Sequence, residues 1–315
     1  MKRFAWFGVL SVIFIIGLLT GGCAKKPPST QQPSPIEEEF HVYIAFGQSN
    51  MAGWGEIRPQ DKTGISGRWQ TLNVVDGTYA GENRVKGQWY KAVPPLIIPD
   101  MGINIGLGPS DYFGRTLAAG TPEHIKIGVV AVANGDMALA AFHKTKANNY
   151  YQGVGAVSGR PSAMEMLGMN RYKNAGYANM YDAIIQNARI AQQTGVIKGI
   201  IAHQGESGVG LSGIAWAAML KEIYDDMLAD LGLAPNSIPI LLGQTWNGGS
   251  GQTDGALAGD SVIQTVLPNA WIISSRGCSG RNGNRRPDNL HFGSAGIELL
   301  GARYGEKMLE LVYKN

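Results

Sequence analysis

Short apolar stretches recur along this chain, separated by longer stretches with amphipathic patterns. In each short stretch most successive side chains are apolar and many are β-branched, a pattern typical of parallel strands covered on both faces. Five such strands are predicted, over residues 41–46, 125–133, 196–202, 238–242 and 270–274.

Apolar residues at helical spacing predict three helices, over residues 177–194, 214–231 and 294–311, with Ser294 as the N-cap of the last. Strands that alternate with helices favour a doubly wound α/β sheet, which binds ligands at the carboxyl ends of its strands. We therefore expect the chemistry in the loops that follow the strands. Residues 47–118 are rich in Gly, Pro, Trp and Asp, and predict long loops over one rim of the sheet.

The N-terminus has the features of an export signal. Lys2 and Arg3 precede an apolar run over residues 4–19, which is short for a membrane span and typical of a signal peptide. The Thr-Gly-Gly-Cys sequence that ends at Cys23 resembles the lipobox of bacterial lipoproteins, in which the cysteine carries lipid. Thr20 replaces the large aliphatic residue usual in a lipobox, so simple secretion and a retained N-terminal anchor stay open as alternatives.

A flexible tether is predicted after this signal. Residues 24–35 contain four prolines among Ser, Thr and Gln, a composition that buries too little apolar surface to fold. We divide the chain into a lipoprotein-type signal peptide (residues 1–22), a lipid-anchored linker (residues 23–39) and one large domain (residues 40–315). This organisation predicts a secreted lipoprotein, periplasmic or at the cell surface, that meets the membrane only through its lipid.

Composition and charge narrow the class of protein further. The chain has 315 residues, 44% of them hydrophobic, which is enough for one sizeable core. Its 27 basic and 24 acidic residues are intermixed, and no basic cluster points to a nucleic-acid partner. If Cys23 carries lipid, Cys278 has no disulfide partner and is interpreted as a structural thiol.

Ser49 is the first candidate for chemistry, because it lies in a Gly-Gln-Ser-Asn-Met sequence directly after the first predicted strand. A serine at such a turn exposes its hydroxyl at the sheet rim, although most serines in turns are caps rather than nucleophiles. Asp288 and His291, just before the last predicted helix, favour Ser49 as a nucleophile over Ser49 as a cap. An Asp three residues before a His can orient one imidazole nitrogen while the other faces a serine, as acyl transfer requires.

Two more strand ends carry polar residues, Asn-Gly-Asp at 134–136 and His-Gln-Gly-Glu-Ser at 203–207. The backbone amides of Ser49 and Gly135, with the Gln204 side chain, are candidates for binding a developing oxyanion. Hydrogen-bonded turns would have the same composition, so the sequence leaves both interpretations open.

The remaining polar and aromatic residues have more ordinary explanations. His203 is an alternative base, ranked below His291 because only Glu206 lies nearby, and Glu206 is expected to hold the rim together through hydrogen bonds. Trp54, Trp89 and Trp246 fall in predicted rim loops. A tryptophan there stacks on sugars in some enzymes, but more often covers the core.

Three motifs, in this order, resemble the SGNH/GDSL hydrolase superfamily: Gly-Gln-Ser-Asn-Met at 47–51, His-Gln-Gly-Glu-Ser at 203–207, and Asp-x-x-His-Phe at 288–292. They are most similar to the carbohydrate esterase family 6 branch, which comprises acetylxylan esterases and related sialate O-acetylesterases. The resemblance implies a flavodoxin-like three-layer α/β/α sandwich with a mainly parallel sheet. It also implies no metal or other cofactor, and hydrolysis of acetyl esters on sugars.

The resemblance assigns a role to each matching residue. It implies that Ser49 is the nucleophile, that His291 is the base and that Asp288 orients His291. It also implies that the oxyanion hole is formed by the Ser49 amide, an amide near Gly135 and the Gln204 side chain.

The chain departs from the family at Asp136, where a second glycine is usual. A carboxylate turned inward there opposes a developing oxyanion, whereas one turned outward does not. We expect a serine esterase that deacetylates carbohydrate, most plausibly xylan. The alternatives are a catalytically impaired glycan-binding lipoprotein and an esterase for sialate or lipid esters. The sequence predicts no oligomeric state.

Overall fold

A computed structural model of the chain describes residues 38–79, 81–98, 105–152, 163–207, 213–245, 262–280 and 290–314. The predicted signal peptide, nearly all of the linker with Cys23, Trp246 and Asp288 lie outside these residues. Residues Glu37–Asn315 form one compact unit. None of the helices in the described ranges combines the length and the apolar character needed to cross a membrane.

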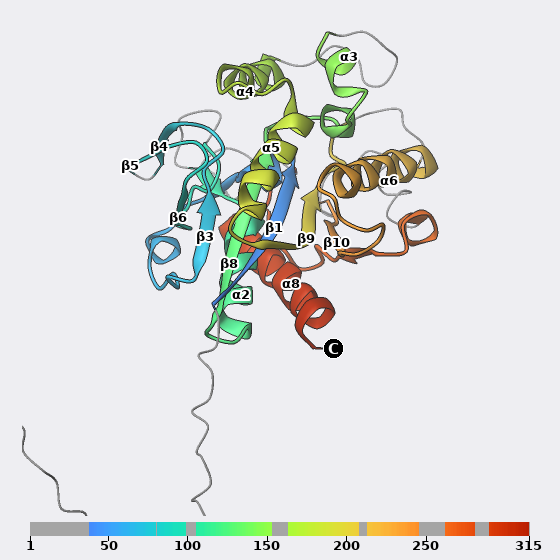
Figure 1. Cartoon of the computed structure of the whole chain (residues 1–315). Coiled ribbons are helices and arrows are strands. Elements are labelled where there is room, and N and C mark those ends of the chain that lie inside the picture. Colours follow the sequence, from blue (N-terminus) through green and yellow to red (C-terminus); the bar gives the residue numbers. More distant parts are fainter. Residues whose placement is uncertain are drawn as a thin grey trace, which may run out of the picture. The chain divides into compact units, whose positions relative to one another are not determined.

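A seven-stranded sheet forms the centre of this unit, with the strand order β11-β10-β9-β1-β8-β3-β6 (Figure 1). Its strands are β1 Glu39–Gly47, β3 Trp69–Leu72, β6 Trp89–Lys91, β8 Ile125–Ala133, β9 Val196–His203, β10 Ile240–Gly243 and β11 Ala270–Ile273. All neighbouring pairs are parallel except β3 and β6. Without β3 and β6, the order is that of flavodoxin-like folds, with β1 at the point where the chain switches direction across the sheet.

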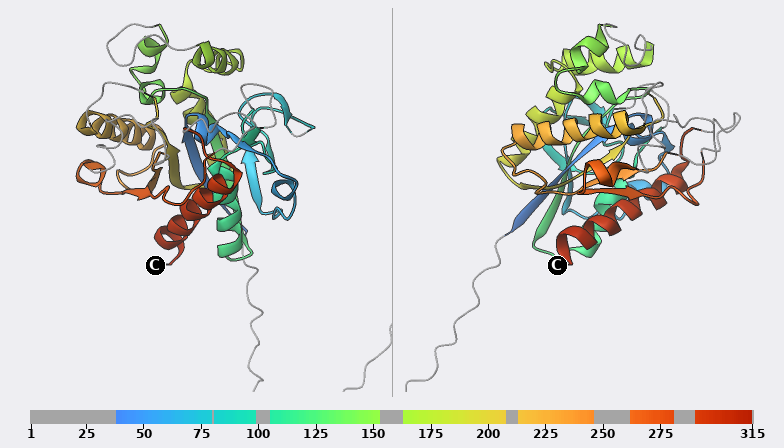
Figure 2. Two further views of the ribbon diagram at one scale, coloured as in Figure 1. Left: turned by 180° about the vertical axis from the view of Figure 1, so that it is seen from behind. Right: turned by 90° about the vertical axis from the view of Figure 1, so that its right-hand side faces the viewer.

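Helices cover both faces of the sheet, as the two views in Figure 2 show. The helices α2 Pro109–Gly120 and α8 Ser294–Tyr313 pack on one face, and α5 Met180–Gln192 and α6 Gly213–Asp230 on the other. Successive residues of β1 belong to opposite cores, since Tyr43 packs with the α2 and α8 side chains and Ile44 with those of α5 and α6. Both faces of β1 are therefore buried, and the predicted three-layer α/β/α sandwich is confirmed.

The described chain also contains shorter elements. They are α1 Ser49–Ala52, β2 Gly55–Glu56, η1 Pro59–Lys62, β4 Gly77–Tyr79, β5 Glu82–Arg84, β7 Ile105–Leu107, η2 Leu139–Phe142, α3 Ala147–Tyr151 and α4 Ala163–Asn174.

The prediction of long rim loops over residues 47–118 is wrong in part. Within that range β3 and β6 extend the main sheet beyond β8, and α2 packs against α8. Both strands have four residues or fewer, too few for a periodic pattern to show. Gly114 of α2 lies against the Trp69 ring, where an added Cβ would come within 2.2 Å of a ring carbon. Gly114 therefore allows a close contact between α2 and β3, and does not mark a loop.

One predicted helix boundary needs correction. The N-cap of α8 is Gly293, and Ser294 is the first helical residue, whose Oγ donates to the backbone oxygen of Glu56 at 2.6 Å. The sheet starts at Glu39, whose amide donates to the backbone oxygen of His124.

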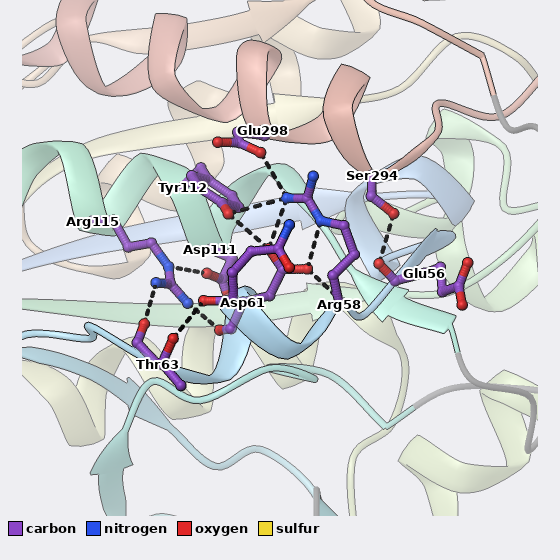
Figure 3. Close-up of polar contacts among 10 residues, drawn as sticks. Glu56, Arg58, Asp61, Thr63, Asp111, Tyr112, Arg115, Ser294 and Glu298 are labelled. Carbon is purple, nitrogen blue, oxygen red and sulfur yellow. Dashed lines mark hydrogen bonds and ion pairs between the residues drawn. The ribbon is translucent and has the colours of Figure 1, made fainter.

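A polar cluster fixes η1 to both helices of the α2/α8 layer (Figure 3). The Arg58 guanidinium donates to Asp61 at 2.8 Å and to Glu298 at 2.6 Å, while the Tyr112 hydroxyl donates to Asp61 at 2.7 Å. Burial alone raises the pKa of Asp61, but hydrogen bonds from Arg58 and Tyr112 outweigh it and lower the pKa overall. Asp61 is thus an anion that anchors the segment following Trp54.

Candidate active site

Three loops meet at the carboxyl edge of the sheet. At the end of β1, Gly47 pairs with Ala133 of β8 on one side and with His203 of β9 on the other. The Asn134 amide donates to the Gly47 oxygen at 3.3 Å, and the Gln48 amide donates to the His203 oxygen at 3.1 Å. The polar residues that follow β1, β8 and β9 therefore lie side by side.

Gly47 makes this meeting possible. Its φ is +151°, and an added Cβ would lie 2.1 Å from the backbone oxygen of His203. Only a residue without a side chain lets β1 approach β9 so closely and turn at once into α1. Ser49, the first residue of α1, is thereby held at the strand end.

The Ser49 hydroxyl meets the His291 imidazole. His291 Nε2 lies 2.8 Å from Ser49 Oγ, although the two residues are 242 positions apart in the chain. Both residues are largely buried, at 2% and 6% exposed. This is the contact between nucleophile and base that acyl transfer requires, because the neutral imidazole can take the hydroxyl proton.

The Trp54 ring covers the His291 ring. The ring centroids are 4.0 Å apart and the planes differ by 9°. Trp89, by contrast, lies in β6 and packs edge-on against Phe40 at 4.6 Å. Of the tryptophans predicted in rim loops, Trp54 thus lies at the site and Trp89 covers a strand of the sheet.

The Gln204 side chain is fixed across the site. Its Nε2 donates to the backbone oxygen of Met137 at 2.7 Å, and its Oε1 accepts from the Gly205 amide at 2.7 Å. The first bond ties the end of β9 to the loop after β8, which begins with Asn134 and Gly135.

Asp136 is exposed, and its Oδ1 accepts a hydrogen bond from the Ser207 hydroxyl at 3.2 Å. Its φ is +64°, in the left-handed region that glycine adopts most readily. This conformation places the Asp136 carboxylate at the surface, bonded to Ser207.

The alternative base, His203, faces a different partner. Its Nε2 lies 2.9 Å from Glu206 Oε1, and that oxygen also accepts from Asn50 Nδ2 at 2.7 Å. Burial raises the pKa of Glu206, but the charge and hydrogen bond of His203 and the hydrogen bond of Asn50 lower it overall. Glu206 is therefore a buried carboxylate that holds His203 and Asn50, while His291 is the histidine in contact with Ser49.

Cys278 is buried and forms no disulfide with another described residue, and Arg303 Nη1 lies 3.7 Å from its Sγ. Burial raises the pKa of this thiol, which keeps it protonated. In the described ranges, no group of three or more His, Cys, Asp and Glu residues is arranged to hold a metal ion.

The chain matches the family described as carbohydrate esterase, sialic acid-specific acetylesterase, over residues 39–310. The chain belongs to this family. The match runs from the start of β1 into α8, so it includes the whole sheet and every described site residue. The expected carbohydrate O-acetylesterase is thus confirmed at the level of the family, while carbohydrate esterase family 6 is not singled out.

Two solved structures share the fold of this esterase. A protein from Arabidopsis thaliana superimposes with a TM-score of 0.59 at 20% identity, covering 86% of this chain and 98% of that one. NanS superimposes with a TM-score of 0.58 at 17% identity, covering 89% of this chain and 99% of its own. The likeness extends over most of this chain and nearly the whole of each solved structure, and it shows a shared fold.

Sequence reasoning did not foresee the roles of Asn50 and Trp54. Asn50 follows Ser49 and is completely buried, which is unusual for an amide unless it is fully hydrogen-bonded. A polar residue between a candidate nucleophile and an apolar Met51 was the signal in the sequence. Trp54 offered no such signal beyond its place in a Gly-rich turn.

Proposed function

We infer that this esterase removes O-acetyl groups from carbohydrate through an acyl-enzyme formed on Ser49. The observation that carries this proposal is the 2.8 Å contact between Ser49 Oγ and His291 Nε2, in a chain of a carbohydrate acetylesterase family. Ser49 Oγ attacks the acetyl carbonyl carbon while His291 takes the hydroxyl proton. His291 returns that proton to the sugar oxygen as it leaves, and the acetyl group stays on Ser49.

The second half of the reaction reuses the same groups. Water attacks the acetyl-Ser49 carbonyl, and His291 takes a proton from the water. The tetrahedral intermediate then expels Ser49 Oγ, which recovers its proton from His291, and acetate is released. Asp288 is proposed to orient His291, on the strength of the Asp-x-x-His spacing alone.

Each tetrahedral intermediate carries a negatively charged oxygen, which hydrogen-bond donors must stabilise. We assign this role to the Ser49 amide, the Gly135 amide and the Gln204 side chain. Their strands end side by side, and the Gln204 bond to Met137 fixes the carboxamide beside the Gly135 loop. Preformed donors of this kind stabilise the charge without reorganising during the reaction.

Two acetylated carbohydrates are proposed as substrates. The three motifs favour acetylated xylan or its oligosaccharides, whereas the matched family favours O-acetylated sialic acid. The lipobox-like sequence before Cys23 supports an enzyme tethered outside the cytoplasm by lipid, where either polymer-derived substrate is met.

Acetate release tests this proposal. The full-length protein is incubated with acetylated xylan, with O-acetylated sialic acid and with a simple aryl acetate, beside its Ser49→Ala variant. Ser49-dependent acetate from xylan or from sialic acid identifies the substrate class. Ser49-dependent release from the aryl acetate alone keeps the mechanism and rejects both carbohydrates. No release from any of the three rejects the proposed activity and favours the glycan-binding alternative.

A further inference from the structure

Asn50 holds the backbone on both sides of His291. Its Oδ1 accepts from the Phe292 amide at 3.1 Å, and its Nδ2 donates to the Leu290 oxygen at 3.2 Å. Asn50 itself is fully buried. The residue that follows the candidate nucleophile thus clamps the two peptide groups that flank the candidate base.

Glu206 fixes which way the Asn50 carboxamide points. Asn50 Nδ2 donates to Glu206 Oε1 at 2.7 Å as well as to the Leu290 oxygen. The reverse orientation would set the amide oxygen against these two acceptors and the amide nitrogen against the Phe292 N–H. With Glu206 in place, only one orientation satisfies all three neighbours.

His203 holds Glu206 from the other side. Its Nε2 lies 2.9 Å from the same Glu206 oxygen, and both side chains are buried, at 0% and 1% exposed. The His203 ring also packs edge-on against Phe292, with centroids 5.6 Å apart and planes at 83°. The segment that carries His291 is therefore braced by a hydrogen-bonded clamp and by a ring contact.

A buried carboxylate such as Glu206 loses hydration free energy unless hydrogen bonds replace the lost water. Asn50 and His203 compensate for part of this loss at Oε1, while Oε2 has no hydrogen-bond partner among the described residues. An ionised carboxylate only accepts hydrogen bonds, so both Asn50 and His203 must donate to it. The direction of every bond in this network is thus defined.

We propose that Asn50 and Glu206 are positioning residues for His291, Asn50 by clamping the peptide groups beside it and Glu206 by locking the Asn50 carboxamide. The hydrogen bonds of Asn50 and Glu206 go to other atoms than Ser49 Oγ and His291 Nε2. Since Ser49 and Asn50 are adjacent, one dipeptide supplies the nucleophile and sets the position of the base. Movement of the β1 end then carries both along and preserves their 2.8 Å contact. This inference rests on the proposed Ser49–His291 chemistry.

The clamp predicts how the kinetic parameters change. A base displaced by about 1 Å lowers the rate about 100-fold, so we expect Asn50→Ala to reduce kcat on an aryl acetate by about that factor. KM should change by less than about threefold, since no substrate contact is removed. Glu206→Gln keeps the shape and one acceptor oxygen, and weakens a charge-assisted hydrogen bond, which predicts a loss in kcat of about 10-fold.

The experiment compares full-length wild type, Asn50→Ala, Glu206→Gln, the double variant and Asn187→Ala. Asn187 is the matched control, because it is also fully buried and its Nδ2 donates two hydrogen bonds, to Tyr177 and to the Ala183 oxygen on α5. Asn187→Ala should lower the thermal midpoint and leave kcat unchanged. Because Glu206 acts through Asn50, the double variant should have the kcat of Asn50→Ala.

Multiplied losses in the double variant would overturn the proposal. An Asn50→Ala variant that loses stability but keeps its kcat, as the control is expected to do, would also overturn it. So would an Asn50→Ala variant in which KM rises and kcat does not fall. If Asn50→Ala does not fold, Glu206→Gln decides alone, and a wild-type kcat in that variant rejects the clamp. A wild type that releases acetate from none of the aryl acetate, acetylated xylan and O-acetylated sialic acid rejects the proposed function instead, so the two failures are distinguishable.

Discussion

The Trp54 indole lies flat on the His291 imidazole, with ring centroids 4.0 Å apart and planes within 9° of parallel. This contact restricts rotation of the histidine ring on one face, while the Ser49 hydroxyl meets its edge. A stacked aromatic face also stabilises a cation, and in the proposed mechanism His291 becomes one each time it takes a proton from Ser49 or from water. The segment after Trp54 is anchored through Asp61.

Replacing Trp54 tests this contact. Trp54→Ala removes both the restraint and the aromatic face, and is expected to lower kcat about fivefold, in line with a cation–π contribution of about 1 kcal/mol. Trp54→Phe keeps a stacking face and should retain most of the activity. Steady-state kinetics on an aryl acetate give the comparison. Equal kcat values in the wild type and Trp54→Ala would show that the stack has no part in the reaction.

Gly47 is predicted to tolerate no side chain. Gly47→Ala forces its new methyl group against the His203 backbone oxygen, 2.1 Å away, and should lower the free energy of unfolding by about 3 kcal/mol or more. Gly232→Ala is the control, because Gly232 also has a positive φ, +67°, but has nothing within 4 Å of an added Cβ. That variant should lose only about 1 kcal/mol. Urea denaturation measures both, and equal losses would contradict the close approach of β1 and β9.

The carboxylate of Asp136 is predicted to leave catalysis undisturbed. Because it is exposed and bonded to Ser207, Asp136→Gly should change kcat by less than about twofold. The relief of the left-handed conformation and the added freedom of glycine in the unfolded chain nearly cancel, within about 1 kcal/mol of unfolding free energy. A kcat that rises tenfold or more would mean instead that the carboxylate opposes the oxyanion.

Hydrophobic patterns along the chain were sufficient to predict the strands that are long and buried on both faces. The strand predicted over residues 125–133 has the bounds of β8, and the other four predicted strands differ from theirs by two residues or fewer at each end. Residues 42–46 show no alternation because each of them is fully buried. The strands β3 and β6 were not predictable, since each is short and flanked by turn residues.

The site was predictable only as far as local sequence carries it. Ser49 and Gln204 follow strands that the pattern predicts, and the parallel topology alone brings such strand ends together. The clamp of Asn50 on the His291 segment joins residues 242 positions apart, and depends on atomic positions that no periodicity encodes. The stacking of Trp54 on His291 depends in the same way on a tertiary contact.

Asp111 is predicted to make stability depend on pH. Burial raises its pKa to about 7, against the attraction of Arg115. A carboxyl group whose pKa is higher in the folded state than in the unfolded state binds more protons when folded. Its contribution to the free energy of unfolding therefore falls as the pH rises from about 4 to about 7.

Asp111→Asn cannot ionise and should remove this part of the pH dependence. Asp225→Asn is the control, because Asp225 is exposed on α6 and pairs there with Lys221. Denaturant unfolding of the three proteins between about pH 4 and pH 8 gives the slopes. If Asp111→Asn keeps the wild-type slope, the buried carboxyl group is not its source.

The central claim is that Ser49 and His291 act as one catalytic unit. Hydrolysis of an aryl acetate by full-length wild type, Ser49→Ala, His291→Ala and the double variant tests it most directly. We predict that each single variant loses roughly a thousandfold or more in kcat, and that the double variant is no worse than either, because members of such a unit fail together. Losses that multiply in the double variant, or a Ser49→Ala variant with wild-type kcat, would contradict the account.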